Sequence, residues 1–180
     1  MSRLSHTFAE LRSRGRKGLV PYVVAGDPSP EGTVTLLHAL VAAGADVLEV
    51  GVPFSDPMSE GPVIQKGHER ALARGMSLQR VLDMVSVFRQ EDNKTPIVMM
   101  GYANPIERFG SVRFASACAM AGVVALIIVD LLPEEVDEID GALLAVGLDN
   151  IFLISPTTPE ARIQTIVERA RGFIYCVAVK

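Results

Sequence analysis

Short apolar segments alternate along the chain with longer stretches in which apolar residues recur at helical spacing. Runs with almost no polar positions are typical of parallel strands that are covered on both faces. The pattern predicts strands near residues 19–25, 47–51, 97–101, 123–129, 150–154 and 173–178. Because helical patterns separate these strands, we expect repeated β/α units.

The same junction occurs in "AAGADVLEV", "MAGVVALII" and "AVGLDNIFL". Each joins the end of a helix to an apolar strand through Gly44, Gly122 or Gly147, and glycine there supplies the left-handed residue that ends a helix. Typical helix-start residues precede the helical stretches. They are Ser29-Pro30-Glu31, Ser77, Ser111, Pro133-Glu134-Glu135 and Thr158-Pro159-Glu160.

Apolar residues mark the inner faces of the predicted helices. The region between the second and third strands has room for two helices, about 62–74 and 78–91. Residues 2–14 predict a short amphipathic helix that covers the core. The apolar positions are Leu4, Phe8 and Leu11, then Val34, Leu37, Leu40 and Val41, then Val81, Leu82, Val85 and Phe88.

We expect residues 1–180 to form a single α/β domain, because no linker or low-complexity tract divides them. Parallel strands covered on both faces occur in doubly wound sheets and in β/α barrels. The sequence contains neither a P-loop nor a G-x-G-x-x-G fingerprint, which would favour a doubly wound sheet. The pattern therefore favours the TIM (β/α)8 barrel family, with about six of its eight units present.

Composition excludes several classes of function. Apolar residues make up 49% of the chain and charged residues 21%, which is typical of a folded domain. The net charge of -4, without a basic stripe, argues against a nucleic-acid partner. The apolar run 123–129 is too short to span a membrane, and the first eighteen residues lack the apolar region of a secretory signal. Cys118 and Cys176 lie in apolar stretches and are expected to be reduced core residues, which indicates a cytoplasmic protein.

Glu49 interrupts the apolar strand in "LEVGVPFSDPMSEGP". Alternation directs Leu48 and Val50 toward the helices and Glu49 into the barrel mouth, where active sites of this fold lie. Burial disfavours the charged carboxylate, so its pKa is expected to rise toward the range useful for proton transfer. The alternative is a structural glutamate held by a backbone or arginine partner. Catalysis is favoured, because uncompensated burial is costly.

Other carboxylates have structural explanations. Glu60 precedes Gly61-Pro62, where a helix is expected to begin, so it is either a helix cap or a second carboxylate of the site. Asp130 ends its strand and is expected to order the following loop. Asp27 and Asp56 each precede a proline and are consistent with turns.

Tyrosines follow or occupy three different predicted strands. Tyr22, Tyr102 and Tyr175, if they converge with Glu49 on the barrel interior, would form an aromatic pocket with hydroxyl groups. Histidines offer no partner spacing for a metal, so no metal site is expected. The three histidines, His6, His38 and His68, are interpreted as surface or helix-edge residues.

The segment "LEVGVPFSDPMSEGPVIQ" closely resembles the signature of the tryptophan synthase alpha subunit family. The resemblance extends over practically the whole chain. Further matching segments, in the order found in the family, are "PYVVAGDP", "PIVMMGYANPI", "VDLLPEE", "FLISPTTPEARI" and "GFIYCV".

The resemblance implies a TIM-barrel lyase that cleaves indole-3-glycerol phosphate to indole and glyceraldehyde 3-phosphate by a retro-aldol reaction in tryptophan biosynthesis. It implies no cofactor in this subunit and a beta-subunit partner that carries pyridoxal phosphate, in an assembly of two alpha and two beta chains. Glu49 matches the catalytic acid/base, Glu60 the second catalytic carboxylate and Tyr175 a tyrosine near the glycerol. The remaining matches are Tyr22, Met100 and Tyr102 at the indole pocket, and Pro53, Asp56 and Asn104 in loops that face the beta subunit.

Two departures from the family pattern matter. The family has aspartate where this chain has Glu60, so we expect lower turnover than in a Glu60→Asp variant. The family also continues beyond residue 180 with a glycine-rich loop and two more units, which usually hold the phosphate. Either these 180 residues belong to a longer chain, or the protein lacks units seven and eight and is a very weak catalyst.

Two other functions are consistent with the sequence. One is a non-catalytic alpha-like subunit that binds and modulates a beta subunit. The other, more remote, is a Schiff-base aldolase that uses Lys180 at the end of the sixth strand.

Overall fold

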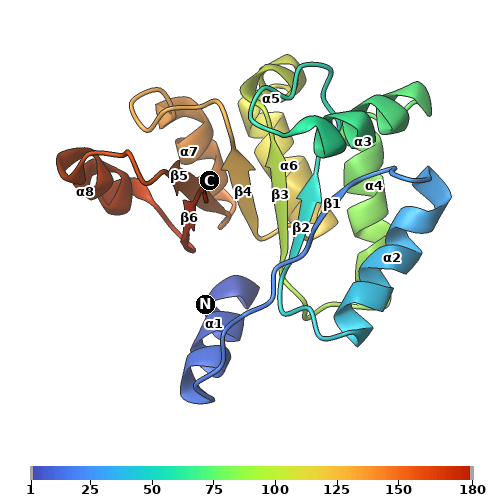
Figure 1. Cartoon of the computed structure of the whole chain (residues 1–180), viewed down its shortest axis with the longest axis horizontal. Helices are drawn as coiled ribbons and strands as arrows, with labels where there is room; N and C mark the ends of the chain where they lie inside the picture. Colours follow the sequence, from blue (N-terminus) through green and yellow to red (C-terminus); the bar gives the residue numbers. More distant parts are fainter. Residues whose placement is uncertain (1, 179–180) are drawn as a thin grey trace.

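The computed structural model describes residues 2–178, and within them it forms one curled sheet of parallel strands (Figure 1). The strands are paired in chain order, so each β/α unit adds its strand beside the preceding one. All six predicted strands are confirmed. The strand expected at 97–101 has those bounds, the one expected at 150–154 begins one residue earlier, and the other four are shorter than expected. They are β1 (Tyr22–Val24), β2 (Leu48–Gly51), β3 (Ile97–Gly101), β4 (Ala125–Ile128), β5 (Asp149–Ile154) and β6 (Ile174–Cys176).

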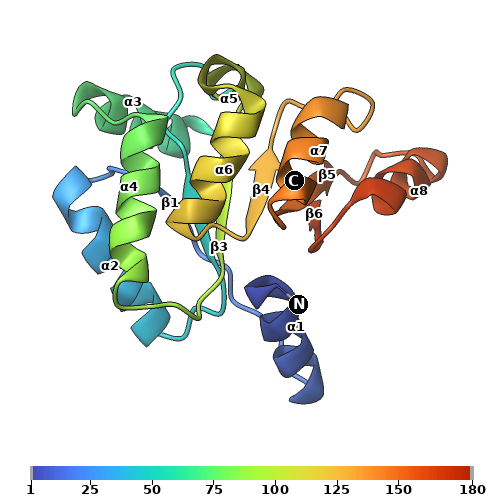
Figure 2. The ribbon, with the colours of Figure 1, turned by 180° about the vertical axis from the view of Figure 1, so that it is seen from behind.

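Helices cover the outer face of the sheet, with α1 beneath it at the end opposite to α3 and α5 (Figures 1 and 2). Gly44, Gly122 and Gly147 all have positive φ angles, of 104°, 91° and 74°, which confirms the predicted helix-to-strand junctions. The helices are α1 (Arg3–Ser13), α2 (Pro30–Ala42), α3 (Pro62–Ala73), α4 (Leu78–Arg89), α5 (Ala103–Phe109), α6 (Ser111–Ala121), α7 (Asp137–Ala145) and α8 (Glu160–Arg169).

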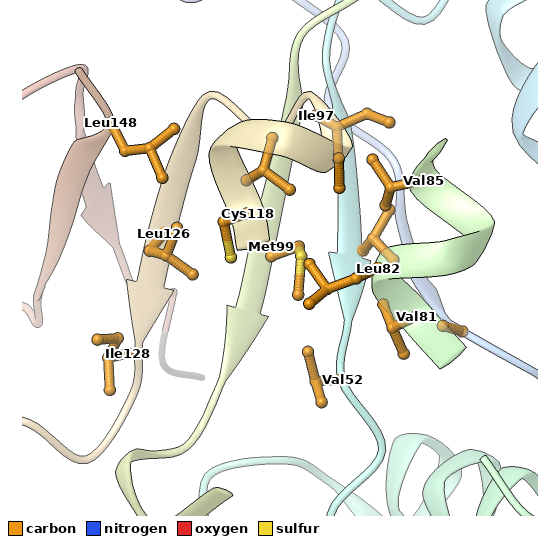
Figure 3. Packing of buried hydrophobic residues seen from close by; sticks show 14 of the residues in the cluster. Val52, Val81, Leu82, Val85, Ile97, Met99, Cys118, Leu126, Ile128 and Leu148 are labelled. Atoms are coloured by element: carbon orange, nitrogen blue, oxygen red, sulfur yellow. The ribbon is translucent and has the colours of Figure 1, made fainter. Parts of the chain in front are cut away.

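Along the strands β3 to β6, alternate residues enter two different cores. The outer core lies between the sheet and the helices, where buried side chains of α4 and α6 pack against those of the strands (Figure 3). Its members include Val52, Val81, Leu82, Val85, Ile97, Met99, Cys118, Leu126, Ile128 and Leu148. The inner core consists of the opposite side chains of the strands together with Leu4, and includes Val47, Val98, Ala125, Ile127 and Ile151.

The N-terminal helix closes one end of the inner core, as the apolar spacing predicts. The Ser2 side chain accepts a hydrogen bond from the Ser5 backbone N–H and so caps α1. Leu4 is completely buried among the inner residues of the strands. Phe8 packs edge to face against Phe173, with the ring centroids 5.7 Å apart.

Three local expectations are wrong. Asn104, which was expected in a loop, lies in the helix α5, whose first turn accommodates Pro105 because a helix needs no N–H donor there. The segment Pro133-Glu134-Glu135 does not begin a helix; the Glu135 N–H donates to the Leu132 carbonyl in a turn, and α7 begins later. Cys176 is exposed rather than buried, because it lies on β6 at the edge of the described sheet, whereas Cys118 is buried.

In the part of the chain that the structure describes, no helix combines the length and the apolar character that a membrane crossing requires.

Candidate active site

Glu49 lies in β2 on the inner face of the sheet. Its neighbours Leu48 and Val50 enter the outer core, and Val47 enters the inner core, which confirms the predicted alternation. Glu49 is only 4% exposed. Burial raises its pKa to about 7, and no charge or hydrogen bond from the residues that the structure describes opposes this shift. The alternative of a structural glutamate fixed by an arginine finds no partner among these residues.

Tyr22 stands beside Glu49. The two residues are register partners across the β1–β2 pair. The Tyr22 ring also lies over Gly51, where a Cβ atom would come within 2.2 Å of the phenol oxygen. Burial, and then the charges of Glu60 and Glu49, raise the pKa of Tyr22, so its hydroxyl keeps its proton.

Tyr175 and Met100 belong to the same inner face, and both are half-buried. Burial raises the pKa of Tyr175, and the negative charges of Glu49 and Glu60 raise it further. Tyr175 is therefore within electrostatic reach of both carboxylates, although it comes from β6 and they come from β2 and the loop after it.

Glu60 is not a helix cap. The helix α3 begins with Gly61 as its N-cap, and no side chain caps it. The Glu60 carboxylate instead accepts a hydrogen bond from the Tyr102 hydroxyl, and its Oε1 atom lies 4.0 Å from His68 Nε2. The carboxylate is thus held between residues of two neighbouring β/α units.

Tyr102 is 1% exposed, so it offers the site its hydroxyl rather than an open ring face. The Ser59 N–H donates to this hydroxyl at 3.2 Å, and the ring stacks on Phe54 with centroids 5.0 Å apart. Tyr102 therefore ties the loop between β2 and α3 to the end of β3, while its own proton is donated to Glu60.

His68 was expected at the surface or at the edge of a helix, and that expectation is wrong because its side chain is buried. The side chain is 1% exposed, because α3 turns this residue toward β1 and the loop after β2. The Phe54 N–H donates to its Nδ1 atom at 3.0 Å, and the Tyr22 hydroxyl lies 3.4 Å from Nε2. The sequence gives a signal for this burial, because Ile64, His68 and Ala71 recur at helical spacing. His38 is half-buried and stacks on Phe88, whereas His6 is exposed.

The three residues expected to face a partner differ in exposure. Asp56 and Asn104 are exposed, but Pro53 is buried beneath the loop. Asn104 lies in the first turn of α5, so its predicted position in a loop is wrong. On the loop between β2 and α3, which carries Asp56, the apolar side chain of Met58 is 73% exposed.

Two residues of the sequence analysis remain, Asp130 and Lys180. The Asp130 carboxylate accepts a hydrogen bond from the Ala103 N–H at 2.8 Å, so it binds the beginning of α5, and its expected role in ordering the loop after β4 stays a prediction. Lys180 lies outside the described residues. Within residues 2–178, no group of three or more histidine, cysteine, aspartate or glutamate side chains is arranged to hold a metal ion.

The chain is similar to proteins of one family over its whole length. The family model described as tryptophan synthase alpha chain matches residues 8–180. The tryptophan synthase alpha chain of Laribacter hongkongensis is 53% identical over 180 residues, which are 100% of this chain and 68% of that protein. That of Burkholderia thailandensis is 54% identical, and the match covers 100% of this chain and 66% of the relative. The chain thus spans about two thirds of the length of these relatives.

Solved structures agree with the sequence relatives. Tryptophan synthase subunit alpha from Legionella pneumophila superposes with a TM-score of 0.97 at 48% identity, over 100% of this chain and 70% of that chain. A chain of the tryptophan synthase complex from Pyrococcus furiosus superposes with a TM-score of 0.84 at 38% identity, over 88% and 65%. The curled sheet is therefore part of the TIM barrel expected from the sequence. The chain belongs to the tryptophan synthase alpha chain family.

Proposed function

We propose that this protein is a lyase that cleaves indole-3-glycerol phosphate to indole and glyceraldehyde 3-phosphate in tryptophan biosynthesis. Membership of the alpha chain family supports this activity. The observation that carries the proposal is the Glu49 carboxylate, which is buried on the inner face of the sheet and has a pKa of about 7. Such a group both donates and accepts protons near neutral pH.

Glu49 is proposed as the catalytic acid and base. Protonation of the indole ring carbon that bears the glycerol side chain places positive charge on the indole nitrogen. Removal of the proton from the adjacent glycerol hydroxyl then forms the aldehyde, and the electron pair of the broken carbon–carbon bond restores the aromatic ring. One carboxyl group that gives a proton and receives another returns to its starting state.

Glu60 is proposed to stabilise the charge that develops at the indole N–H. Its carboxylate is held by the Tyr102 hydroxyl, Met100 belongs to the inner core, and Tyr22 is the register partner of Glu49. Tyr175, which lies on β6, is proposed to contact the glycerol portion, since the charges of Glu49 and Glu60 both raise its pKa. Positioning of this kind matters, because a displacement of about 1 Å can cost a hundredfold in rate. The expected advantage of Glu60→Asp in turnover stays a prediction.

The alpha chain family carries no pyridoxal phosphate, which belongs to the beta subunit. We propose that this protein docks on such a beta subunit, in an assembly of two alpha and two beta chains. The exposed Asp56 and Asn104 would contact it, and buried Pro53 would shape the loop that carries Asp56. The existence of tryptophan synthase complexes among the similar structures supports this partner. A cytoplasmic location stays a prediction of the cysteine content.

Measurement of indole release from indole-3-glycerol phosphate tests the proposal. The Glu49→Gln variant keeps the shape of the side chain but cannot exchange protons, so we expect a loss of about 10²- to 10⁴-fold in kcat. An active wild-type protein and an equally active Glu49→Gln variant would contradict the role of Glu49. Absence of indole release together with a change in beta-subunit turnover would instead support the non-catalytic alternative. Borohydride trapping with substrate would reveal the Schiff-base alternative at Lys180.

A further inference from the structure

His68 carries two polar contacts in a setting that is otherwise closed to solvent. The backbone N–H of Phe54 donates to Nδ1 at 3.0 Å, so Nδ1 must present its lone pair. A neutral imidazole then carries its proton on Nε2. The contact with the loop therefore selects one tautomer of the ring.

The Nε2–H group of this tautomer faces two oxygen atoms of the candidate site. The Tyr22 hydroxyl oxygen lies 3.4 Å away and Glu60 Oε1 lies 4.0 Å away. Burial lowers the pKa of His68, and the charge of Glu60 opposes this shift. A neutral ring has a single donor to offer, and that donor is directed at the groups that surround Glu49 rather than at solvent.

The orientation of the Tyr22 hydroxyl follows from this contact. An oxygen that accepts a hydrogen bond from His68 Nε2–H directs its own proton elsewhere. The Tyr22 ring lies over Gly51 on the inner face, beside its register partner Glu49. The proton of Tyr22 is therefore free to be donated to an acceptor other than His68.

We propose that His68 is a positioning residue for the lyase reaction. Its Nε2–H group orients the Tyr22 hydroxyl and limits where the Glu60 carboxylate can lie. This inference rests on the proposed function of the site. His68 itself needs no contact with the substrate, and its effect passes through Tyr22 and Glu60. A structural role would instead depend on Nδ1, which anchors the loop at Phe54.

Two substitutions separate these roles. The Oδ1 atom of asparagine takes the place of Nδ1, so His68→Asn retains an acceptor for the Phe54 N–H and loses the donor to Tyr22. The side-chain amide of glutamine reaches the place of Nε2, so His68→Gln retains the donor and loses the acceptor. For positioning, we expect His68→Asn to lower kcat about tenfold and to raise KM severalfold, and His68→Gln to lower kcat about threefold or less with little change in KM. The reverse order of the two variants would overturn the proposal. The exposed His6 provides the control substitution His6→Asn.

A double-mutant cycle with Tyr22→Phe tests whether His68 acts through Tyr22. In the Tyr22→Phe protein the hydroxyl is absent, so we expect His68→Asn to add less than about a threefold further loss of kcat. A full and independent tenfold loss in both backgrounds would show that His68 does not act through Tyr22.

Two further measurements keep this inference separate from the proposed function. Indole binding should weaken about tenfold in His68→Asn and much less in His68→Gln, whether or not the wild-type protein turns over. Nitrogen NMR of the His68 ring should show a neutral Nε2–H tautomer at pH 7. A wild-type protein that releases no indole would contradict the proposed function alone, whereas an Nδ1–H tautomer, or equal indole affinity in both variants, would overturn the role of His68.

Discussion

Tyr22 and Gly51 are in such close contact that a Cβ atom on the glycine would approach the Tyr22 hydroxyl oxygen to 2.2 Å. The absent side chain leaves room for the phenol ring on the inner face, next to Glu49. A glycine in a strand often marks a place where another group must come close. Here that group is a neighbouring side chain of the candidate site.

Gly51→Ala should therefore displace Tyr22 and destabilise the protein by about 1–3 kcal/mol, the usual cost of overpacking a core. Urea denaturation measures the loss, and indole release should fall with it. Gly101→Ala is the matched control, because its Cβ would meet Val52 at 3.5 Å, an ordinary contact distance. In the Tyr22→Ala background, where the ring is absent, Gly51→Ala should cost less unfolding free energy than in the wild type. An equal cost in both backgrounds would contradict the steric explanation.

The buried Glu49 should make stability depend on pH. Its pKa rises from 4.5 to about 7 on folding, so the folded state retains a proton that the unfolded state releases. The favourable contribution is complete below pH 4.5 and is lost as the pH rises through 7, by about 3 kcal/mol at most. Glu49→Gln lacks this titration.

Urea denaturation of the wild type and Glu49→Gln at pH 5 and pH 8 gives the comparison. We expect the wild type to lose stability relative to the variant at the higher pH. A constant difference between the two proteins would show that the Glu49 carboxyl group is solvated rather than buried.

The contact between Tyr102 and Glu60 should be visible in both activity and stability. Tyr102→Phe removes the hydroxyl that donates to the carboxylate and accepts from the Ser59 N–H. We expect a loss of about 1.5–3 kcal/mol in unfolding free energy, because the bond involves a charged acceptor. If Glu60 has the role proposed for it at the indole N–H, turnover should fall about tenfold when the carboxylate loses this bond.

The cycle of Tyr102→Phe with Glu60→Gln supplies the control for that interpretation. Residues in contact couple, so the double variant should lose less than the sum of the two single losses. Strict additivity would indicate that the hydroxyl and the carboxylate act independently.

The outer core gives a prediction that is independent of the site. Met99 is completely buried between β3 and the helices (Figure 3), whereas Met120 on α6 is 88% exposed. Met99→Ala should cost about 2–5 kcal/mol in unfolding free energy, and Met120→Ala less than about 0.5 kcal/mol. Thermal or urea denaturation measures both losses. Comparable losses in the two variants would contradict the burial of Met99 and the exposure of Met120.

Much of the fold could be predicted because the strands are apolar on both faces. Glu49 stands out as the polar residue in such a strand, and alternation alone directs it inward. Gly122 and its counterparts mark the helix ends, since few other residues adopt positive φ angles.

The errors come from contacts between segments that are distant in the sequence. His68 reads as an ordinary helix-edge residue until the loop at Phe54 is placed against it. Glu60 has the position of a cap, but the Tyr102 hydroxyl from the next unit binds it. Cys176 reads as core because its neighbours are apolar, and only the position of β6 at the edge of the described sheet shows otherwise. Local periodicity does not contain this information.

The hydrogen bond from the Ala103 N–H to Asp130 fastens the beginning of α5 to the chain that leaves β4. The next residue, the exposed Asn104, therefore lies in a helix turn that is fixed to the ends of two adjacent strands. A subunit that docks on this first turn of α5 would meet a surface that is already ordered, so its association would cost little conformational entropy there.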